Sequence, residues 1–334
     1  MQRRMSARLK TFIATLFLFS SFTGAAQDVQ LRTRVELVVV PVSVRDKSGK
    51  LVGDLNREEF NITEAGKRQS ITQFSIDPAP LSVVLLIDTG VTDVALQNVK
   101  NSFPALLGAF SEDDEVAIYR FDRTVERVLD FTYDHVQLEK TFEKLQSATA
   151  SASSSGGGPF SIPGPVINGS PIIPGVQAAG RSAALPTKVL HDAMFDAAEY
   201  LGTRSTDRRR IIVLASDGRN ENSQNSYETA LNRLLVHEVH VFALGVDTSL
   251  FQRLRSTLLN YAKGTGGESW FPDSQAAIEL CYSLSTEAAR NQYVLGYAST
   301  NKRPAGRSVF REIKVAVTRP GTEVRHRKGY YQTP

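Results

Sequence analysis

Two carboxylate side chains stand directly after buried-strand sequences in this 334-residue chain. Asp88 follows the continuous apolar run LSVVLLI, and Asp217 follows IIVLAS. A third polar feature, Thr187, stands just before a helical pattern. Open α/β sheets bind ligands beyond the carboxyl ends of their strands. The sequence therefore predicts a ligand site at this edge of a sheet, with both aspartates in it.

The elements that must position these residues alternate between strand and helix. Strand patterns cover Leu81–Ile87, Glu115–Phe121, Arg210–Ala215 and Val239–Val246, with shorter ones at Glu126–Phe131 and Glu268–Phe271. Apolar residues at helical spacing lie between them, and Pro104 is expected to kink or break the first helix. This alternation predicts a doubly wound, mostly parallel sheet with helices on both faces.

The two ends of the chain have a different, antiparallel character. Residues 30–76 contain the valine-rich run VELVVVPVSV and turn sequences, and strand patterns return after residue 292. We expect a small antiparallel β-unit built from both end segments. The predicted boundaries are 27–80 for the N-terminal β-segment, 81–291 for the α/β domain and 292–334 for the C-terminal β-segment. Within the α/β domain, the Ser-, Gly- and Pro-rich range 147–186 indicates a flexible insertion.

The order strand-DTGVT, then a Thr before a helix, then strand-SDG resembles a von Willebrand factor A (VWFA) domain. Flanking segments at Asp54–Phe60, Tyr293–Tyr297 and Lys328–Tyr331 are similar to a related family of exported bacterial proteins. The resemblance covers nearly the whole chain after its first residues. It implies a VWFA-like fold and a binding function without catalysis.

The same resemblance implies a metal-ion-dependent adhesion site. Asp88, Thr92, Thr187 and Asp217 would be its ligands, and Mg²⁺, or Mn²⁺ or Ca²⁺, its ion, open to a carboxylate of a protein partner. Two features depart from the family pattern. Gly90 stands where the family has its first Ser, which removes a hydroxyl ligand, and Thr187 is about one residue out of register with the helix. A metal-free structural or assembly module of the cell envelope is therefore the alternative.

An enzymatic interpretation is the least favoured. The run LLIDTGVT also resembles the aspartic peptidase signature, in which two aspartates share a proton. That fold is all-β, whereas Asp88 is followed by a helical pattern. The run His237–His240 (HEVH) lacks the spacing of a zinc helix and lies partly in a predicted strand.

The first residues predict export. A basic head with Arg3, Arg4, Arg8 and Lys10 precedes an apolar run and Gly24-Ala25-Ala26, which is the order of a signal peptide over residues 1–26. No later segment has the length and apolarity of a transmembrane span. Four of the basic residues behind the net charge of +4 lie in this head, so the charge balance does not favour nucleic acid binding. The single cysteine, Cys281, is expected to be a buried thiol.

Overall fold

A six-stranded sheet forms the centre of the α/β domain. Its strands lie in the order β12 (Ser269–Trp270), β11 (Val239–Gly245), β10 (Arg209–Ser216), β5 (Leu81–Asp88), β6 (Glu115–Phe121) and β7 (Val125–Thr132). All neighbours are parallel except β7, which runs antiparallel to β6. The computed structural model describes residues 37–76, 78–152, 166–167, 170–171, 188–246 and 252–334.

The central strand β5 shows why the sheet needs two helical layers. Every residue of β5 is buried. Val83, Leu85 and Ile87 belong to one hydrophobic core, and the alternate residues Val84 and Leu86 belong to a second. Because successive side chains of a strand point to opposite faces, both faces of the sheet must be covered.

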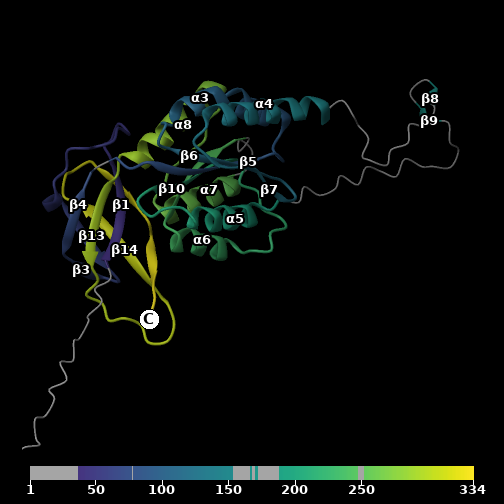
Figure 1. The fold of residues 1–334 in the computed structure, drawn as a ribbon. Helices are drawn as coiled ribbons and strands as arrows, with labels where there is room; N and C mark the ends of the chain where they lie inside the picture. Colours follow the sequence, from purple (N-terminus) through teal and green to yellow (C-terminus); the bar gives the residue numbers. More distant parts are fainter. Residues whose placement is uncertain (1–36, 77, 153–165, 168–169, 172–187, 247–251) are drawn as a thin grey trace, which may run out of the picture. The chain divides into compact units, whose positions relative to one another are not determined.

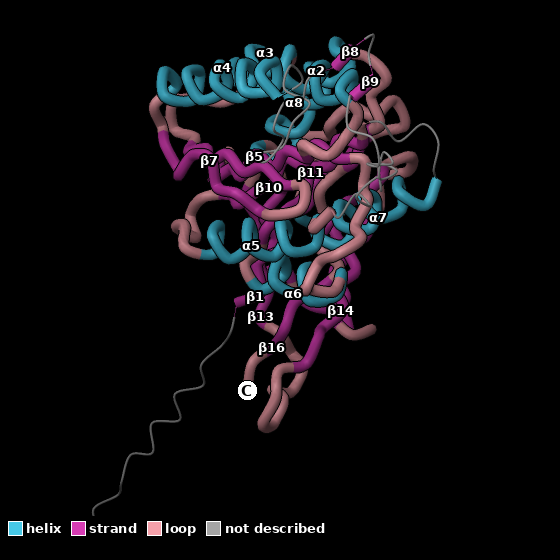
Figure 2. The backbone as a smooth tube through the Cα atoms, turned by 90° about the vertical axis from the view of Figure 1, so that its right-hand side faces the viewer, coloured by secondary structure: helices cyan, strands magenta, loops and turns pink. Residues whose placement is uncertain are grey.

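Helices cover the two faces of the sheet as the sequence predicts. Residues of α2, α3, α4 and α8 pack into the first core, and residues of α5, α6 and α7 pack into the second. Figures 1 and 2 show these two groups on opposite sides of the sheet. The helices are α2 (Asp93–Asn101), α3 (Phe103–Ala109), α4 (His135–Ala152), α5 (Leu190–Gly202), α6 (Tyr227–Val236), α7 (Gln252–Thr265) and α8 (Gln275–Arg290).

The ends of several helices follow from local side chains. Thr92, Ser226 and Ser274 cap α2, α6 and α8, because each side-chain oxygen accepts a hydrogen bond from a backbone N–H of the first turn. Pro104 lies in the first turn of α3, where a proline is tolerated. The predicted helix after β5 is therefore broken into α2 and α3.

The end segments form the predicted antiparallel β-unit, in two four-stranded sheets. One has the order β15 (Glu323–His326), β1 (Leu37–Arg45), β13 (Tyr293–Ala298) and β4 (Ile71–Ser75). The other has the order β16 (Gly329–Gln332), β14 (Val309–Val317), β2 (Phe60–Glu64) and β3 (Lys67–Gln69), with β2 preceded by the short 3-10 helix η1 (Arg57–Glu59). Valines of β1 and residues of β2, β13 and β14 share one core. Figure 1 shows these strands from the two ends of the sequence gathered together.

Some predictions fall on parts of the chain outside the description. The signal peptide, residues 1–26, lies outside the described residues, as does most of the predicted insertion. Within residues 147–186, helix α4 continues through Ala152, and the strands β8 (Val166–Ile167) and β9 (Ser170–Pro171) pair with each other. Among the helices that the structure describes, none has both the length and the apolar character of a membrane span.

Candidate functional site

The candidate site lies at the carboxyl ends of β5 and β10, the two neighbouring strands at the middle of the sheet. From β5 the chain continues through α2 and α3 to β6 on one side, whereas β10 is followed by β11 on the other side. The order of the strands therefore reverses between β5 and β10, which is where α/β sheets bind ligands. Asp88 ends β5 and Asp217 follows the last residue of β10, as predicted.

Lys188 joins these two carboxylates. Its Nζ donates to Oδ2 of Asp88 at 3.0 Å and to Oδ2 of Asp217 at 2.8 Å. The three side chains are buried, with exposed fractions of 2%, 0% and 3% in that order. Charged groups are rarely buried without a partner, because removing them from water is costly. The three residues thus form one ionic cluster, called here the Lys188 triad.

Asp88 is held by further hydrogen bonds. Its Oδ2 also accepts from Oγ of Ser216 at 2.7 Å, and its Oδ1 accepts from the N–H of Gly90 at 2.9 Å. Burial raises the pKa of Asp88, while the charge of Lys188 opposes the rise and that of Asp217 adds to it. Ser216 in turn accepts from the N–H of Gly218 at 3.0 Å, so this buried serine ties the start of the loop after β10 to Asp88.

Asp217 is fixed by the same loop. Its Oδ1 accepts from the N–H of Arg219 at 2.9 Å, and Nε of Arg219 lies 3.4 Å from Oδ2. The guanidinium is partly exposed, with 37% of the Arg219 side chain accessible. Asp217 therefore links a buried ammonium to a cation at the surface.

The backbone around Lys188 is fixed on two sides. Its carbonyl oxygen accepts from the N–H groups of Glu221 and Asn222, at 2.9 and 3.2 Å. The N–H of Val189 donates to the carbonyl of Asp122, in the loop after β6, at 2.9 Å. Three loops at this edge of the sheet thus converge on Lys188.

Gly90 makes room for the stem of Lys188. A Cβ atom at position 90 would lie 2.9 Å from Cε of Lys188 and 3.4 Å from Oδ1 of Asp88. The first of these contacts is shorter than carbon atoms tolerate. The glycine that departs from the family pattern is therefore also the residue that lets the lysine approach.

The two predicted hydroxyl residues have different outcomes. Thr92 is exposed and caps α2, where its Oγ1 accepts from the N–H of Ala95 at 3.4 Å. Thr187 lies outside the described residues. The structure thus brings together Asp88 and Asp217, and it adds Lys188 and Ser216, which the sequence reasoning missed. The signal that could have revealed Lys188 is the combination of the missing serine at position 90 with a lysine directly after the expected threonine.

We tested whether these residues fit a divalent ion. An ion bound by Oδ2 of both aspartates would take the place of the Lys188 ammonium, and all four carboxylate oxygens already accept hydrogen bonds from the protein. Among the described residues, no group of three or more His, Cys, Asp or Glu side chains is placed to hold a metal. In this arrangement the site fits an ammonium and does not fit a divalent ion.

The structure also bears on the two enzymatic interpretations. Asp88 ends a parallel strand of an α/β sheet, whereas aspartic peptidases are all-β, and its carboxylate is buried and paired with Lys188. His240 lies in β11 and is 4% exposed, with its pKa lowered by burial to about 3. A zinc helix over residues 237–240 is therefore absent.

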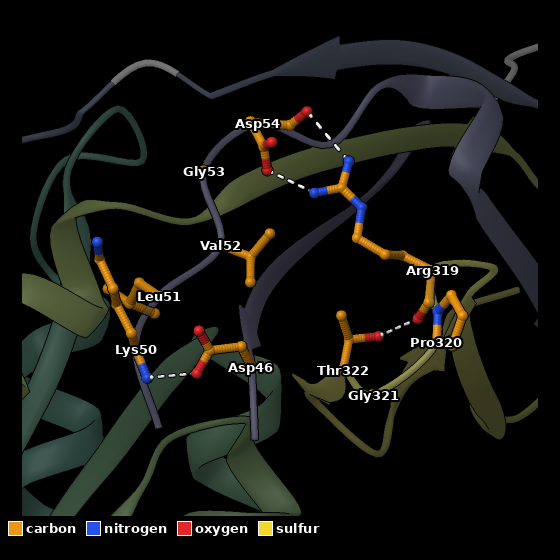
Figure 3. A pocket seen from close by; sticks show the side chains of 10 residues that line it. All are labelled: Asp46, Lys50, Leu51, Val52, Gly53, Asp54, Arg319, Pro320, Gly321 and Thr322. Atoms are coloured by element: carbon orange, nitrogen blue, oxygen red, sulfur yellow. Dashed lines mark hydrogen bonds and ion pairs between the residues drawn. The ribbon is translucent and has the colours of Figure 1, made fainter. Parts of the chain in front are cut away.

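A groove of about 430 Å³ in the β-unit is a second place where charged residues gather (Figure 3). Arg319 spans one side, with Nη1 2.6 Å from Oδ1 of Asp54 and Nε 3.1 Å from Oε1 of Glu59. Oδ1 of Asp46 accepts from the N–H groups of Ser48 and Lys50. These groups satisfy one another, so we assign the groove a structural role in fixing the turns of the β-unit.

Comparison with known proteins gives similarity in fold. No family model matches the chain, and the search of curated proteins gives no match. Among solved structures, a von Willebrand factor type A protein from Catenulispora acidiphila is 9% identical, with 90% of this chain and 75% of that chain covered and a TM-score of 0.44. The manganese-loaded TRAP protein of Plasmodium vivax is 12% identical, with coverages of 81% and 98% and a TM-score of 0.42.

BatB, a conserved hypothetical protein from Bacteroides thetaiotaomicron, is 15% identical, with 62% of this chain and 99% of that chain covered and a TM-score of 0.39. At such low sequence identities the similarity to these proteins concerns the fold alone. In this chain β5 and β10 lie at the centre of the sheet, β7 is an antiparallel edge strand, and an aspartate stands at the carboxyl end of each central strand. The doubly wound sheet, with β7 as an antiparallel edge strand, is the fold expected of a von Willebrand factor A-like domain.

Proposed function

We propose that this protein is an exported binding module that engages a protein partner at the carboxyl edge of its central sheet and catalyses no reaction. The observation that supports the proposal is the Lys188 triad. It ties the ends of β5 and β10 to the start of α5 at the place where α/β sheets bind ligands. The carboxylates of Asp88 and Asp217, which could otherwise act as acid or base, are both paired with Lys188. Because the triad joins the ends of two strands to the start of a helix, this edge of the sheet is a rigid platform.

The platform presents an exposed rim. Thr92, Asp93 and Val94 follow β5 at the start of α2, and Val94 is 73% exposed. Thr92 caps α2, so the backbone that carries Val94 is fixed before a partner binds. The Val94 side chain therefore loses little conformational entropy when a partner covers it. We propose that this rim contacts the partner.

The metal-dependent form of the proposal uses Asp88, Thr92, Thr187 and Asp217 as ligands for Mg²⁺, or for Mn²⁺ or Ca²⁺. It requires the Lys188 ammonium to leave both carboxylates first. The metal-free form, a binding or assembly module of the cell envelope, requires no such rearrangement. We therefore favour the metal-free form.

A matched pair of surface variants tests the binding function. Val94→Arg places a charge on the rim. Val136→Arg places the same charge on α4, where Val136 is 55% exposed. Position 136 follows Thr132, which pairs with Val116 near the start of β6, so it lies at the opposite edge of the sheet. Envelope proteins of the source cell captured by the wild type should be lost with Val94→Arg and retained with Val136→Arg. Equal capture by both variants would contradict a partner site at the rim.

Export is tested separately. The basic head and the apolar run before Gln27 support removal of residues 1–26. Mass spectrometry of the protein from the native envelope fraction should give a chain that begins at Gln27. An intact Met1 end in the inner membrane would show that the segment acts as an anchor.

A further inference from the structure

We propose that the ammonium of Lys188 is a built-in cation that replaces the divalent ion at the adhesion site of this VWFA-like fold, with Gly90 as the substitution that makes room for it. The inference concerns the same edge of the sheet as the proposed function. Its readouts, metal binding and thermal stability, need no partner and can therefore fail independently of that function.

The geometry around Nζ is that of an ammonium site. Both contacts to carboxylate oxygens, at 2.8 and 3.0 Å, are in the range of charge-assisted hydrogen bonds. Mg²⁺ needs oxygen ligands at about 2.0–2.1 Å in octahedral geometry. The two oxygens therefore lie around a cation of ammonium size and not around a small ion.

The negative charge of the two carboxylates is also compensated without a metal. One ammonium faces two carboxylates, which leaves a formal deficit of one positive charge. The N–H of Gly90, the hydroxyl of Ser216 and the guanidinium of Arg219 all face these carboxylates and offset that deficit. Replacing Lys188 by a neutral residue would leave Asp88 without a cation and Asp217 with only the partly exposed Arg219.

Position 90 connects the missing serine with the presence of Lys188. A serine there would supply the hydroxyl that the family uses as a ligand, and its Cβ would lie 2.9 Å from Cε of Lys188. The Cβ atom of a serine and the lysine stem thus compete for the same space. The loss of the serine and the presence of the lysine have one explanation, because a tethered cation needs no hydroxyl ligand.

A tethered cation has consequences that a bound ion does not. Occupancy of a metal site depends on the free metal concentration, whereas Lys188 is part of the chain. The loops that meet at the triad are therefore fixed at any metal concentration. The ammonium also offers no open coordination position to a partner's carboxylate, so recognition by the rim must be independent of metal.

The experiment measures Mn²⁺ binding by the loss of the free-ion EPR signal, together with thermal melts in EDTA, Mg²⁺ and Mn²⁺. The wild type should leave the Mn²⁺ signal unchanged and melt at one Tm in all three solutions. The double variant Gly90→Ser/Lys188→Ala restores the hydroxyl and vacates the cation position. It should be less stable than wild type in EDTA, bind Mn²⁺, and gain roughly 5 °C in Tm at a hundredfold excess over Kd.

Lys100→Ala is the matched control. Lys100 and Lys188 are the two buried lysines among the described residues, with exposed fractions of 4% and 1% for the whole residues. Lys100→Ala loses the same stem and charge away from the triad and should show no metal response. Metal binding by the wild type, removed by Asp217→Asn, would overturn the inference. A folded double variant that ignores Mn²⁺ would overturn it as well, and if that variant does not fold, the wild-type Mn²⁺ signal decides.

Discussion

Nε of Arg45 donates to both carboxylate oxygens of Glu268, at 2.8 and 3.0 Å, and this buried pair joins β1 of the β-unit to the loop before β12 of the central sheet. The side chains are 9% and 4% exposed. Nη1 of Arg45 also donates to the carbonyl oxygen of Gly49 at 2.6 Å. The end segments and the α/β domain are thus connected by a charge pair that water scarcely reaches.

Glu268→Gln should therefore destabilise the protein by about 3–5 kcal/mol, because it leaves the Arg45 guanidinium buried beside a neutral group. Urea unfolding monitored by circular dichroism measures the loss. The control is Glu58→Gln, which removes the partner of Arg57 in a pair whose side chains are 53% and 71% exposed. That change should stay within about 0.5 kcal/mol of wild type. Equal effects of the two substitutions would mean that the buried pair contributes no more than a surface pair.

Deleting residues 293–334 should unfold the N-terminal β-segment. Both neighbours of β1, namely β13 and β15, lie in the deleted range, as does β14, which pairs with β2. Hydrogen exchange should show that backbone amides of residues 37–75 lose their protection. Deleting only residues 333–334, which follow β16, should leave that protection unchanged. Protected N-terminal strands in the longer deletion would show that this segment folds without its partner strands.

Stability should fall with acidification because of His240. Burial, together with the nearby charges of Arg209 and Arg327, lowers the pKa of His240 to about 3. Its usual value in an unfolded chain is about 6.5. Below that pH the unfolded state takes up a proton that the folded state does not, so His240 should cost about 1.4 kcal/mol per pH unit between about pH 6.5 and 3.

The comparison with His240→Gln isolates this contribution, because glutamine does not titrate. Unfolding free energies at several pH values between 6.5 and 5 should decline more steeply for the wild type than for the variant. Parallel curves would show that His240 is protonated in the folded protein as readily as in the unfolded chain.

Gly266→Ala should cost much more than Gly49→Ala. Both glycines have positive φ, at +80° and +84°, a conformation that costs other residues about 1–2 kcal/mol. A Cβ at position 266 would also lie 2.5 Å from the backbone nitrogen of Arg327, whereas nothing lies within 4 Å of one at position 49. Chemical denaturation should give a loss of about 1–2 kcal/mol at position 49 and more than twice that at position 266. Similar losses would show that the link between β15 and β16, which carries Arg327, moves aside easily.

Periodicity predicted most of the fold because burial dictates it. The uninterrupted apolar run of β5 required cover on both faces, and the valines of β1 required partners that the central alternation did not supply. The extent of α4 was harder to predict. Residues 146–152 (QSATASA) merge into a Ser- and Gly-rich stretch, and the helix ends at Ala152 with no proline or glycine to mark the point.

Only those residues of the site that lie at the ends of strands could be predicted from the sequence. Asp88 and Asp217 were expected together because the ends of parallel strands meet at one edge. Lys188 was missed because lysine is ordinarily exposed, and only the three-dimensional pairing with two carboxylates makes its burial favourable. Thr92 was ambiguous because a hydroxyl before a helix suits both a metal ligand and a helix cap. The structure shows the cap, and a role for Thr92 in metal binding stays a prediction.

The pairing of β4 with β13 affects how the protein would respond to a mechanical force that pulls its two ends apart. The chain passes from β4 to β5 as it enters the central sheet and from α8 to β13 as it leaves, so the entry and the exit are hydrogen-bonded neighbours. A pull applied at Leu37 and Gln332 acts first on β1 and β16, which belong to the β-unit. The two chain connections to the α/β domain are held side by side by this pairing. A protein anchored through its two ends could thus be stretched while the edge that carries Lys188 keeps its shape.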